Sequence, residues 1–340
     1  MNWNLLAEKS LAGTALLRPE AHAVLDAGPD QIPALVAAAY RVRRRFFGNR
    51  VRLNYLLNTK SGLCSEDCHY CSQSKQSQAP IQKYPWLSVE EVLHKAGRAL
   101  ELQAGRLCLV ASGRSPAPRE LEQMVVCAKA VRERYPQLEL CCCLGFLSKD
   151  EAEALKTAGV DAVNHNLNTS EHYYGNICQT HSYTDRLSTL QGIRQAGLSA
   201  CSGALVGMGE TPDDILDLAY ALRELDVESL PVNFLMPIEG TLLAHQTTLT
   251  PTRCLSILCL FRFLNPRASL RIAGGREIHL RSLQSLGLYV ANSIFIGDYL
   301  TTKGQPAEDD LAMIRDMGFA IEGHALPDDA PAPVPQVVLK

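Results

Sequence analysis

Cys64-Ser65-Glu66-Asp67-Cys68-His69-Tyr70-Cys71 holds three cysteines in one short loop, with three and then two residues between them. Three thiols leave one unpaired in any disulfide arrangement, whereas three thiolates can surround a single inorganic centre. A structural zinc site takes four protein ligands, while a cubane iron–sulfur cluster held by three cysteines keeps one iron open for a substrate or cofactor. The loop therefore favours an iron–sulfur centre, with the ring of Tyr70 beside the last ligand.

Two other interpretations of this loop stay open at this point. His69 or one of the distant cysteines could complete a structural zinc site. Cysteines that are simply buried, with no ligand role, are also common in proteins. The rest of the chain has to decide between these possibilities.

The overall composition is that of an ordinary globular protein. The chain has 340 residues, 46% of them hydrophobic and 20% charged, with a net charge of −3, so we expect neither nucleic-acid nor membrane binding. No stretch approaches the roughly 20 apolar residues of a membrane span, and the N-terminus lacks the pattern of a secretory signal. We therefore expect a cytoplasmic protein whose 12 cysteines are reduced and act as ligands or core residues.

An alternation of strands and helices begins at residue 51. Strand patterns occur at residues 51–57, 107–111, 138–143, 162–166, 199–206, 229–234, 270–273 and 292–295. Helical patterns separate them, at residues 88–103, from 119, from 148, and at 184–195, 211–225, 251–263 and 277–286. Such alternation predicts an α/β fold with a parallel sheet, and eight units over this length favour a closed (β/α)8 TIM-type barrel.

The sequence divides into three parts around this alternation. Residues 1–50 predict an N-terminal helical extension, in which residues 32–47 carry an apolar stripe at helical spacing and Gly48 ends the helix. Residues 51–322 form the predicted barrel domain. Residues 323–340 are a Pro-rich tail, which we expect to be disordered.

A second group of residues falls inside the predicted strands. Cys108, Cys141, Cys201 and Arg271 lie in the second, third, fifth and seventh strands. If each side chain points inward, the four converge on one buried volume, where three thiolates and one further ligand could hold a second cluster. The alternatives are that the cysteines are small core residues and that Arg271 is a buried cation paired with a carboxylate.

A polar stretch, Asn164-His165-Asn166-Leu167-Asn168-Thr169-Ser170, follows the fourth strand. In a parallel barrel the functional site lies at the C-terminal ends of the strands, so this stretch and the cysteine loop fall at the same face. Amide side chains both donate and accept hydrogen bonds, which suits ribose hydroxyls or a ureido group. The same residue types are also usual in helix caps and turns.

Five motifs in one order resemble those of the biotin synthases, a family of radical S-adenosylmethionine enzymes. The motifs are CSEDCHYCSQ at residues 64–73, NHNLNTS at 164–170, YGN at 174–176, CSGALVGMGET at 201–211 and NSIF at 292–295. The resemblance extends from about residue 50 to about residue 320 and therefore covers most of the chain. The cysteine loop alone would indicate only the superfamily.

The resemblance implies two clusters and a ligand set for each. Cys64, Cys68 and Cys71 would hold a 4Fe–4S cluster whose open iron binds S-adenosylmethionine. A 2Fe–2S cluster, the implied sulfur donor, would be held by Cys108, Cys141, Cys201 and Arg271. No catalytic side chain beyond the cluster ligands is implied.

The resemblance also implies which residues contact the small molecules. S-adenosylmethionine would be contacted by Tyr70, Asn166, Asn168 and Arg186, with Asn168 at the ribose hydroxyls and Arg186 at the methionine carboxylate. Dethiobiotin would be contacted by Asn166, Asn233, Thr301 and Thr302.

Three positions depart from the family pattern or leave it ambiguous. Some members have an aspartate where this chain has Asn168, and an amide lacks the charge of that contact. His181 stands where some members have an arginine, so any charge there would depend on pH. Cys142 and Cys143 adjoin Cys141, and strand alternation predicts that Cys141 and Cys143 share a face while Cys142 points the opposite way.

The activity implied is radical insertion of sulfur into dethiobiotin to form biotin. The partners implied are dethiobiotin, an electron donor of the flavodoxin or ferredoxin type, and a second copy of the chain in a homodimer. One alternative is another radical S-adenosylmethionine enzyme on the same barrel, a mutase or lyase without a sulfur donor. The other is a non-catalytic metal or iron–sulfur carrier.

Overall fold

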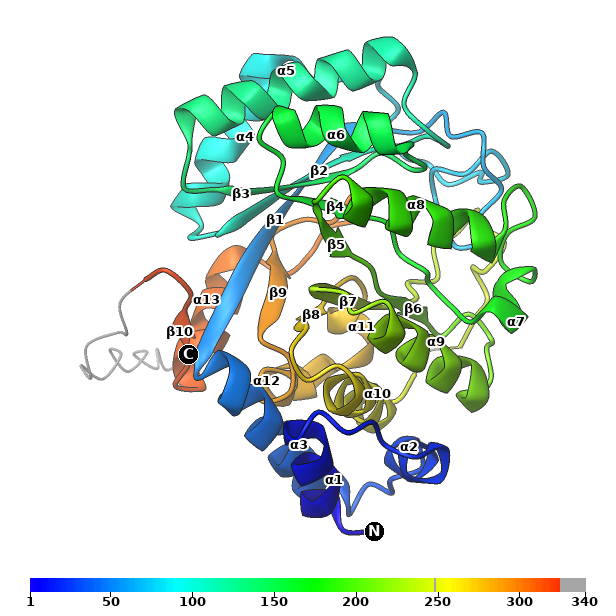
Figure 1. Ribbon diagram of the computed structural model, residues 1–340, viewed down its shortest axis with the longest axis vertical. Helices are drawn as coiled ribbons and strands as arrows, with labels where there is room; N and C mark the ends of the chain where they lie inside the picture. Colours follow the sequence, from blue (N-terminus) through cyan, green and yellow to red (C-terminus); the bar gives the residue numbers. More distant parts are fainter. Residues whose placement is uncertain (248, 325–340) are drawn as a thin grey trace, which may run out of the picture.

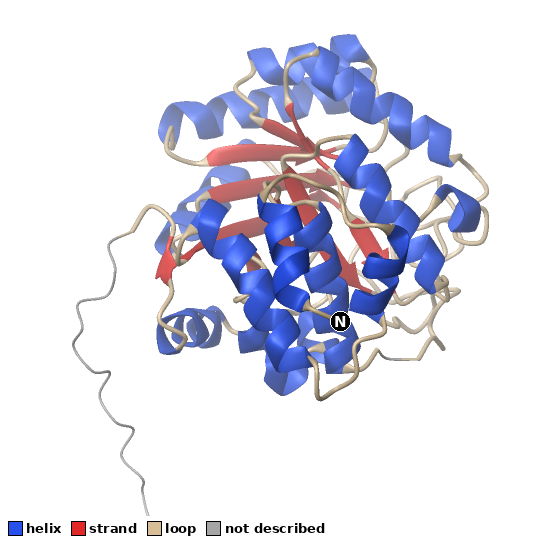
Figure 2. Ribbon diagram, turned by 60° about the horizontal axis from the view of Figure 1, so that its bottom comes forward, coloured by secondary structure: helices blue, strands red, loops and turns tan. Residues whose placement is uncertain are grey.

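The computed structural model describes residues 1–247 and 249–324 of the chain. Its strands are parallel and close into a barrel, because β1 pairs with β2 on one side and with β9 on the other. The order around the barrel is β1-β2-β3-β4-β5-β7-β8-β9, and β6 pairs with β7. Helices lie outside the strands (Figures 1 and 2). The predicted (β/α)8 barrel is confirmed.

The barrel strands are β1 (Arg50–Lys60), β2 (Arg106–Ala111), β3 (Glu139–Cys143), β4 (Ala162–Asn164), β5 (Ser199–Cys201), β6 (Ala204–Val206), β7 (Ser229–Phe234), β8 (Ser269–Ile272) and β9 (Ser293–Ile296). The main outer helices are α4 (Val89–Glu101), α5 (Pro118–Arg134), α6 (Lys149–Thr157), α8 (Tyr183–Gln195), α9 (Pro212–Glu224) and α10 (Pro251–Leu264). The predicted capping box at the start of α4 is present: Ser88 Oγ accepts from the Glu91 backbone, and the Glu91 carboxylate accepts from the Ser88 backbone.

The predicted strand at residues 199–206 is wrong in its continuity. It is two short strands, β5 and β6, separated by Ser202 and Gly203. The backbone of Gly203 lies so close to β7 that an added Cβ would be 1.9 Å from the Pro231 carbonyl oxygen. A bend toward the neighbouring strand therefore replaces the continuous ladder, and only glycine fits at its closest point.

The predicted helix at residues 277–286 is also interrupted. It is formed by α11 (Arg276–His279), the 3₁₀ turn η1 (Arg281–Leu283) and α12 (Gln284–Gly287). The interruption coincides with Arg281, whose φ of 50° lies in the left-handed region and cannot continue a right-handed helix. Three further elements lay outside the sequence prediction: α7 (Glu171–Tyr174), α13 (Ala307–Asp316) and β10 (Ala320–Ile321), which pairs with the start of β1.

The first 47 residues form α1 (Trp3–Leu11), α2 (Arg18–Leu25) and α3 (Ile32–Phe47), and all three pack against α10 outside the barrel. Their buried apolar side chains join those of the barrel helices in one continuous core. The division of the chain into a helical extension and a barrel domain stays a prediction. The predicted disorder of residues 325–340 falls outside the described residues.

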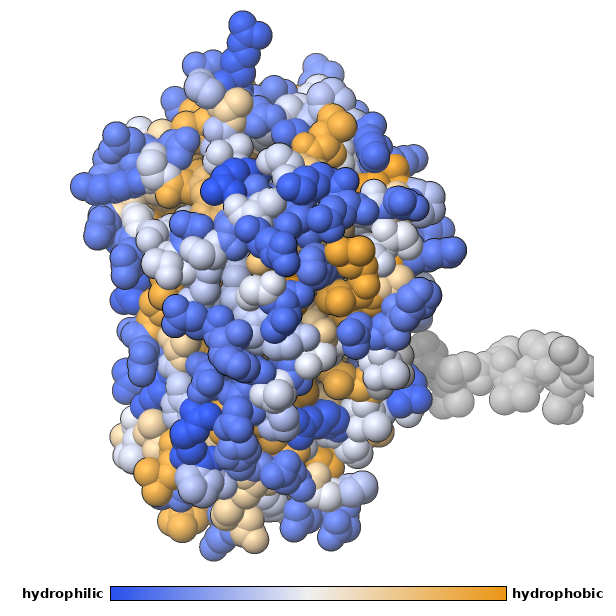
Figure 3. Space-filling view, turned by 90° about the vertical axis from the view of Figure 1, so that its right-hand side faces the viewer, coloured by the Kyte–Doolittle hydropathy of each residue, from blue (hydrophilic) through white to orange (hydrophobic). Residues whose placement is uncertain are grey.

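On the face shown in Figure 3, hydrophilic side chains predominate and hydrophobic ones occur in small separate groups. Among residues 1–247 and 249–324, no helix has the length and apolar character needed to cross a membrane.

Candidate functional site

A cavity of about 280 Å³ lies at the C-terminal end of the barrel. Its wall comes from the strands and from the segments that follow β1, β4, β7, β8 and β9. Among the residues singled out from the sequence, the cavity wall includes Tyr70, Cys71, Cys108, Cys141, Asn166, Asn168, Asn233, Arg271, Thr301 and Thr302. The structure thus brings together residues as distant in the chain as Tyr70 and Thr302, as the barrel geometry predicts.

The cysteine loop directly follows β1 and is held by backbone hydrogen bonds. Cys71 N donates to Cys68 O at 3.1 Å within the loop, and His69 N donates to Ile177 O at 2.9 Å outside it. Cys64, Cys68 and Cys71 are free thiols. Cys71 is part of the cavity wall, whereas Cys64 and Cys68 are not.

Inside the barrel, Cys108, Cys141 and Cys201 form a buried group distinct from the main core. Cys108 lies opposite Cys141 in the β2–β3 register, and Cys201 lies opposite Asn164 in the β4–β5 register. Asn164 Nδ2 donates to Cys201 Sγ at 3.3 Å. The predicted convergence of these three thiols is therefore present in the structure.

Strand alternation separates the three consecutive cysteines of β3 as predicted. Cys141 and Cys143 line the cavity, whereas Cys142 belongs to the outer core between the strands and the helices. Of the two cavity cysteines, Cys141 lies level with Cys108. This favours Cys141 over Cys143 as a partner of Cys108 and Cys201.

Two buried arginines stand beside the three thiols. Arg271 Nη2 and Arg106 Nη1 both donate to Ser229 Oγ, each at 3.2 Å, and Arg271 Nε donates to Ser293 Oγ at 3.3 Å. Within the described residues no hydrogen bond is made by Arg271 Nη1, and the side chain lines the cavity. Arg271 can therefore present one guanidinium nitrogen to a ligand in the barrel.

The charges of these arginines act on the thiols. A hydrogen bond with Cys141, together with the positive charges of Arg271 and Arg106, lowers the pKa of Cys201 against the effect of burial. The same three neighbours lower the pKa of Cys108. Two thiols of the group are thus biased toward the thiolate form, which is the form that binds metals.

Amide side chains form the opposite part of the wall. Asn164 Nδ2 donates to Asn166 Oδ1 at 2.9 Å, and Asn168 Nδ2 donates to Tyr70 Oη at 2.6 Å. Asn168 has a φ of 71°, a conformation that asparagine tolerates better than most residues. The amide row after β4 is therefore fixed both to the strand and to the cysteine loop.

Arg186, on α8, reaches the site from behind this row. Its Nη1 donates to Asn166 O at 2.8 Å, and its Nε donates to Tyr174 Oη. Burial works to lower the pKa of Arg186, but the neighbouring Tyr70 and Tyr174 outweigh it and raise the pKa above the ordinary value. The side chain is thus a fixed positive charge next to the amide row.

His181 connects Arg186 to the cysteine loop. Arg186 Nη2 lies 3.0 Å from His181 Nε2, and His181 Nδ1 contacts the Glu66 carboxylate. Since an arginine can only donate, Nε2 accepts, and the proton on Nδ1 is donated to Glu66. The imidazole is therefore neutral in this arrangement, and Glu66 also accepts from Thr180 Oγ1 at 2.6 Å.

The remaining predicted residues lie in β7 and in the segment that follows β9. Asn233, in β7, accepts from Gly274 N at 3.0 Å and donates to Ala204 O at 3.1 Å. Thr301 Oγ1 lies 2.8 Å from Ser72 Oγ, so the segment after β9 contacts the cysteine loop. These contacts connect the segments that line this part of the cavity.

Sequence reasoning missed Arg106, Ser229 and Cys178. Arg106 stands two residues before Cys108 on the same strand, so alternation would have placed both side chains on one face. Ser229 is opposite Cys201 in the β5–β7 register. No local signal marks Cys178, which the fold brings to 3.9 Å from Cys68 (Sγ to Sγ).

Two family models match the chain. The model of the Radical SAM superfamily matches residues 59–221, and that of the Biotin and Thiamin Synthesis associated domain matches residues 231–320. Apart from residues 222–230, they span the chain from the end of β1 to the start of β10.

Curated relatives match nearly the whole chain. It is 55% identical over 311 residues to the biotin synthase of Renibacterium salmoninarum, covering 92% of this chain and 91% of the relative. It is 52% identical over 320 residues to biotin synthase 2 of Frankia casuarinae, covering 94% and 89%. With the biotin synthase of Bacillus cytotoxicus the identity is 48% over 326 residues, covering 96% and 98%.

Solved structures support the fold. Methylornithine synthase superposes with a TM-score of 0.80 at 18% identity, covering 93% of this chain and 97% of that one. The FeFe-hydrogenase maturase HydG from Carboxydothermus hydrogenoformans gives a TM-score of 0.78 at 18% identity, covering 94% and 79%. At such identities the likeness concerns the barrel alone.

Proposed function

The chain belongs to the biotin synthase family, and from that premise we propose how its own residues divide the work of inserting sulfur into dethiobiotin. The family is one of radical S-adenosylmethionine enzymes, so S-adenosylmethionine and iron–sulfur clusters belong to its chemistry. The observation that carries the proposal is the convergence of two separate thiol groups on one cavity. A mutase or lyase without a sulfur donor has no use for the second group.

The residues present fit a 4Fe–4S cluster in the loop. Cys64, Cys68 and Cys71 are free thiols within eight residues, and only Cys71 reaches the cavity wall. Three thiolates without a fourth cysteine in the loop suit a cluster with one open iron. We therefore assign these three residues as the ligands that would hold it.

The barrel residues fit a 2Fe–2S cluster. Cys108, Cys141 and Cys201 supply three thiols in a buried position, and Arg271 supplies a fourth donor whose Nη1 is not occupied by the described residues. Two adjacent guanidinium groups offset the negative charge of thiolates and sulfides in a site shielded from water. Arg106 is a positioning residue here, because it shares the hydroxyl of Ser229 with Arg271.

When bound, the first cluster supplies the electron that cleaves S-adenosylmethionine into methionine and a 5′-deoxyadenosyl radical, and the second cluster is the sulfur substrate. The chain's residues bind and shield the reactants. Arg186 provides a fixed positive charge that suits the methionine carboxylate, and Asn168 with Tyr70 offers polar groups to the ribose. Asn166 lies between this region and the barrel interior.

The dethiobiotin end of the cavity combines apolar and polar walls. Leu56, Val110 and Phe295 line its apolar part and exclude water, which protects a carbon radical from side reactions. Asn233 suits the ureido group, and the hydroxyls of Thr301 and Thr302 suit the carboxylate.

Further partners follow from the chemistry and from the family resemblance. One-electron reduction of a low-potential cluster calls for a flavodoxin- or ferredoxin-type donor, which we include in the proposal together with a homodimeric assembly. The reliance on reduced thiols argues for the cytoplasm as the compartment.

The test is the iron and sulfide content of protein reconstituted without oxygen, compared with Cys201→Ala. We expect about six irons per chain in the wild type and about four in the variant, which keeps only the first cluster. Cys127→Ala is the matched control, since Cys127 is equally buried but lies on α5. About four irons in both proteins would refute the second cluster and favour a mutase or lyase.

A further inference from the structure

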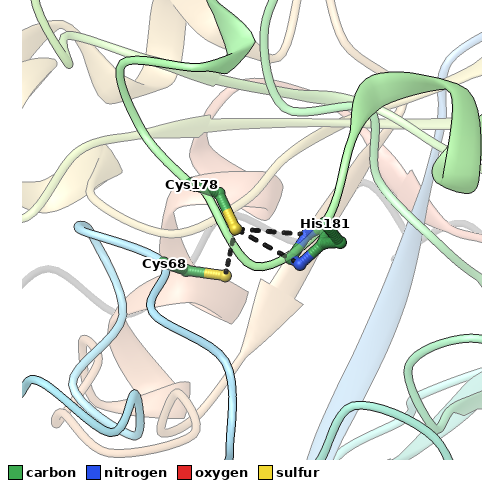
Figure 4. Close-up of side chains that lie close together, drawn as sticks. All are labelled: Cys68, Cys178 and His181. Carbon is green, nitrogen blue, oxygen red and sulfur yellow. Dashed lines mark hydrogen bonds between the residues drawn. The ribbon is translucent and has the colours of Figure 1, made fainter.

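A cysteine outside both thiol groups faces a ligand of the first one. Cys178 lies in the segment between α7 and α8, and its Sγ is 3.9 Å from Cys68 Sγ. Figure 4 shows the sulfur atoms of Cys68 and Cys178 next to one another, with the ring of His181 beside Cys178. Both thiols are buried and free.

The backbone around the pair is firmly tied. His69 N donates to Ile177 O at 2.9 Å, so the residues adjoining Cys68 and Cys178 are hydrogen-bonded to each other. The Asp67 carboxylate accepts from Gln179 N at 3.1 Å and from Thr180 N at 3.2 Å. The closeness of the two thiols is thus a property of two loops fixed side by side.

One possible use of this group is a metal site, because the donor atoms of Cys68, Cys178 and His181 lie within 4.8 Å of one another. The position of the ring argues against it. Cys178 Sγ is 3.2 Å from Nδ1 and 3.6 Å from Nε2, and such similar distances place the sulfur over the ring. The nitrogen lone pairs lie in the ring plane, where Glu66 and Arg186 already engage both nitrogens.

A disulfide bond between the two sulfur atoms does not require the nitrogens of His181. A disulfide bond is about 2.05 Å long, so the sulfur atoms must approach by roughly 2 Å. Rotation about the two Cα–Cβ bonds moves each sulfur by this order without moving the backbone.

We propose that Cys178 is the resolving thiol of Cys68, forming a reversible disulfide with it whenever the first cluster is absent and a peroxide is present. One thiol attacks the peroxide oxygen to give a sulfenic acid and one water. The other thiol then attacks the sulfenic sulfur, which forms the S–S bond and releases a second water. Two thiols lose two electrons and two protons in total, and one hydrogen peroxide is reduced to two waters.

The effect of this disulfide on cluster assembly rests on the proposed function, because Cys68 is a proposed cluster ligand. A disulfide at Cys68 removes one of the three ligands, so the cluster cannot be rebuilt until the bond is reduced. It also keeps Cys68 from further oxidation to sulfinic and sulfonic acids, which thiols do not reverse. Reduction of the disulfide would therefore restore Cys68 as a ligand in a loop that has lost its cluster.

The experiment uses the full chain after chelation of its iron and reduction of its thiols. The protein is treated with hydrogen peroxide without iron, alkylated, and mapped by peptide mass spectrometry. We expect peptides joined through Cys68 and Cys178, a loss of two alkylated thiols, and full return of both thiols after dithiothreitol. Reconstitution should regain the first cluster only after that reduction.

The comparison variants are Cys178→Ser and Cys127→Ser. In Cys178→Ser we expect Cys68 as sulfinic or sulfonic acid and a lasting loss of the first cluster, whereas Cys127→Ser should behave as the wild type. Joining of Cys68 to Cys64 or Cys71, or irreversible oxidation of Cys68 in the wild type, would overturn the proposal. If Cys178→Ser does not fold, the peptide map of the wild type tests the disulfide by itself. The iron content measured before oxidation tests the proposed function separately.

Discussion

Asp214 offers a quantitative test of how the loop that carries the amide row is anchored. It is the third residue of α9, its side chain is 2% exposed, and its carboxylate accepts from Thr211 N at 2.9 Å and Thr211 Oγ1 at 2.6 Å. It also accepts from Ser170 Oγ at 2.5 Å. Ser170 in turn caps α7 and ends the segment that contains Asn166 and Asn168.

These contacts set a pH dependence of stability. Burial raises the pKa of Asp214, but the hydrogen bonds from Ser170 and Thr211 outweigh it and lower the pKa from 3.8 to about 2. A carboxylate whose pKa is lower in the folded state stabilises the fold above its unfolded pKa, and the contribution is lost as the pH falls toward the folded pKa. At 1.36 kcal/mol per unit, the difference amounts to about 2 kcal/mol.

The perturbation is Asp214→Asn, measured by urea unfolding of the cluster-free chain between pH 3 and pH 7. Above pH 5 the pH-dependent part of the difference in unfolding free energy between the wild type and Asp214→Asn should be about 2 kcal/mol. At pH 3 it should be about half of that. Asp217→Asn is the control, because Asp217 lies on the same helix in an exposed pair with Arg18 and should contribute little. A gap for Asp214→Asn that stays constant from pH 7 to pH 3 would refute the reasoning.

Asn168→Asp should tighten S-adenosylmethionine binding by about 1 kcal/mol, or roughly fivefold, because Tyr70 and a ribose would then face a charged acceptor. Equilibrium dialysis measures the dissociation constant, and unchanged or weaker binding would contradict the prediction. Arg106→Met should lower the iron count from about six to about four per chain while the first cluster stays, which Mössbauer spectroscopy can resolve. Gly275→Ala should destabilise the chain by more than about 2 kcal/mol, because its Cβ would lie 2.1 Å from a backbone carbonyl oxygen at a φ of 82°. At Gly318, which has a φ of 71°, an added Cβ would meet nothing within 4 Å, so Gly318→Ala measures the cost of the backbone conformation alone. Equal losses of stability for the two variants in thermal melts would contradict the steric argument.

The barrel could be predicted because its signal is local and repeated. Each strand is a short apolar run, and each helix has its own cap, such as Ser88 for α4 or Ser148 for α6. The period of two in β3 was enough to separate Cys142 from Cys141 and Cys143. Where the prediction failed, as at Gly203, the cause was a contact with a different strand, which no local pattern contains.

The sequence predicted those parts of the site that form continuous motifs. The ligand loop and the amide row are continuous stretches, so their residue types pointed to their chemistry. Cys178 meets Cys68 across 110 residues of sequence, and its contact depends on how two loops are packed. Only the folded arrangement shows that pair.

The pairing of β1 with β9 has a consequence for the order of events during synthesis. Residues 52–55 pair with residues 293–296, so the barrel cannot close until nearly the whole chain has left the ribosome. The three cysteines of residues 64–71 are synthesised early, although the loop gains its hydrogen bonds to residues 177–180 only later. The barrel thiols and Arg271 meet only after closure. The proposed ligands of the first cluster are therefore all present on the nascent chain, whereas the proposed second site must be loaded on a finished molecule, through the open end of the barrel.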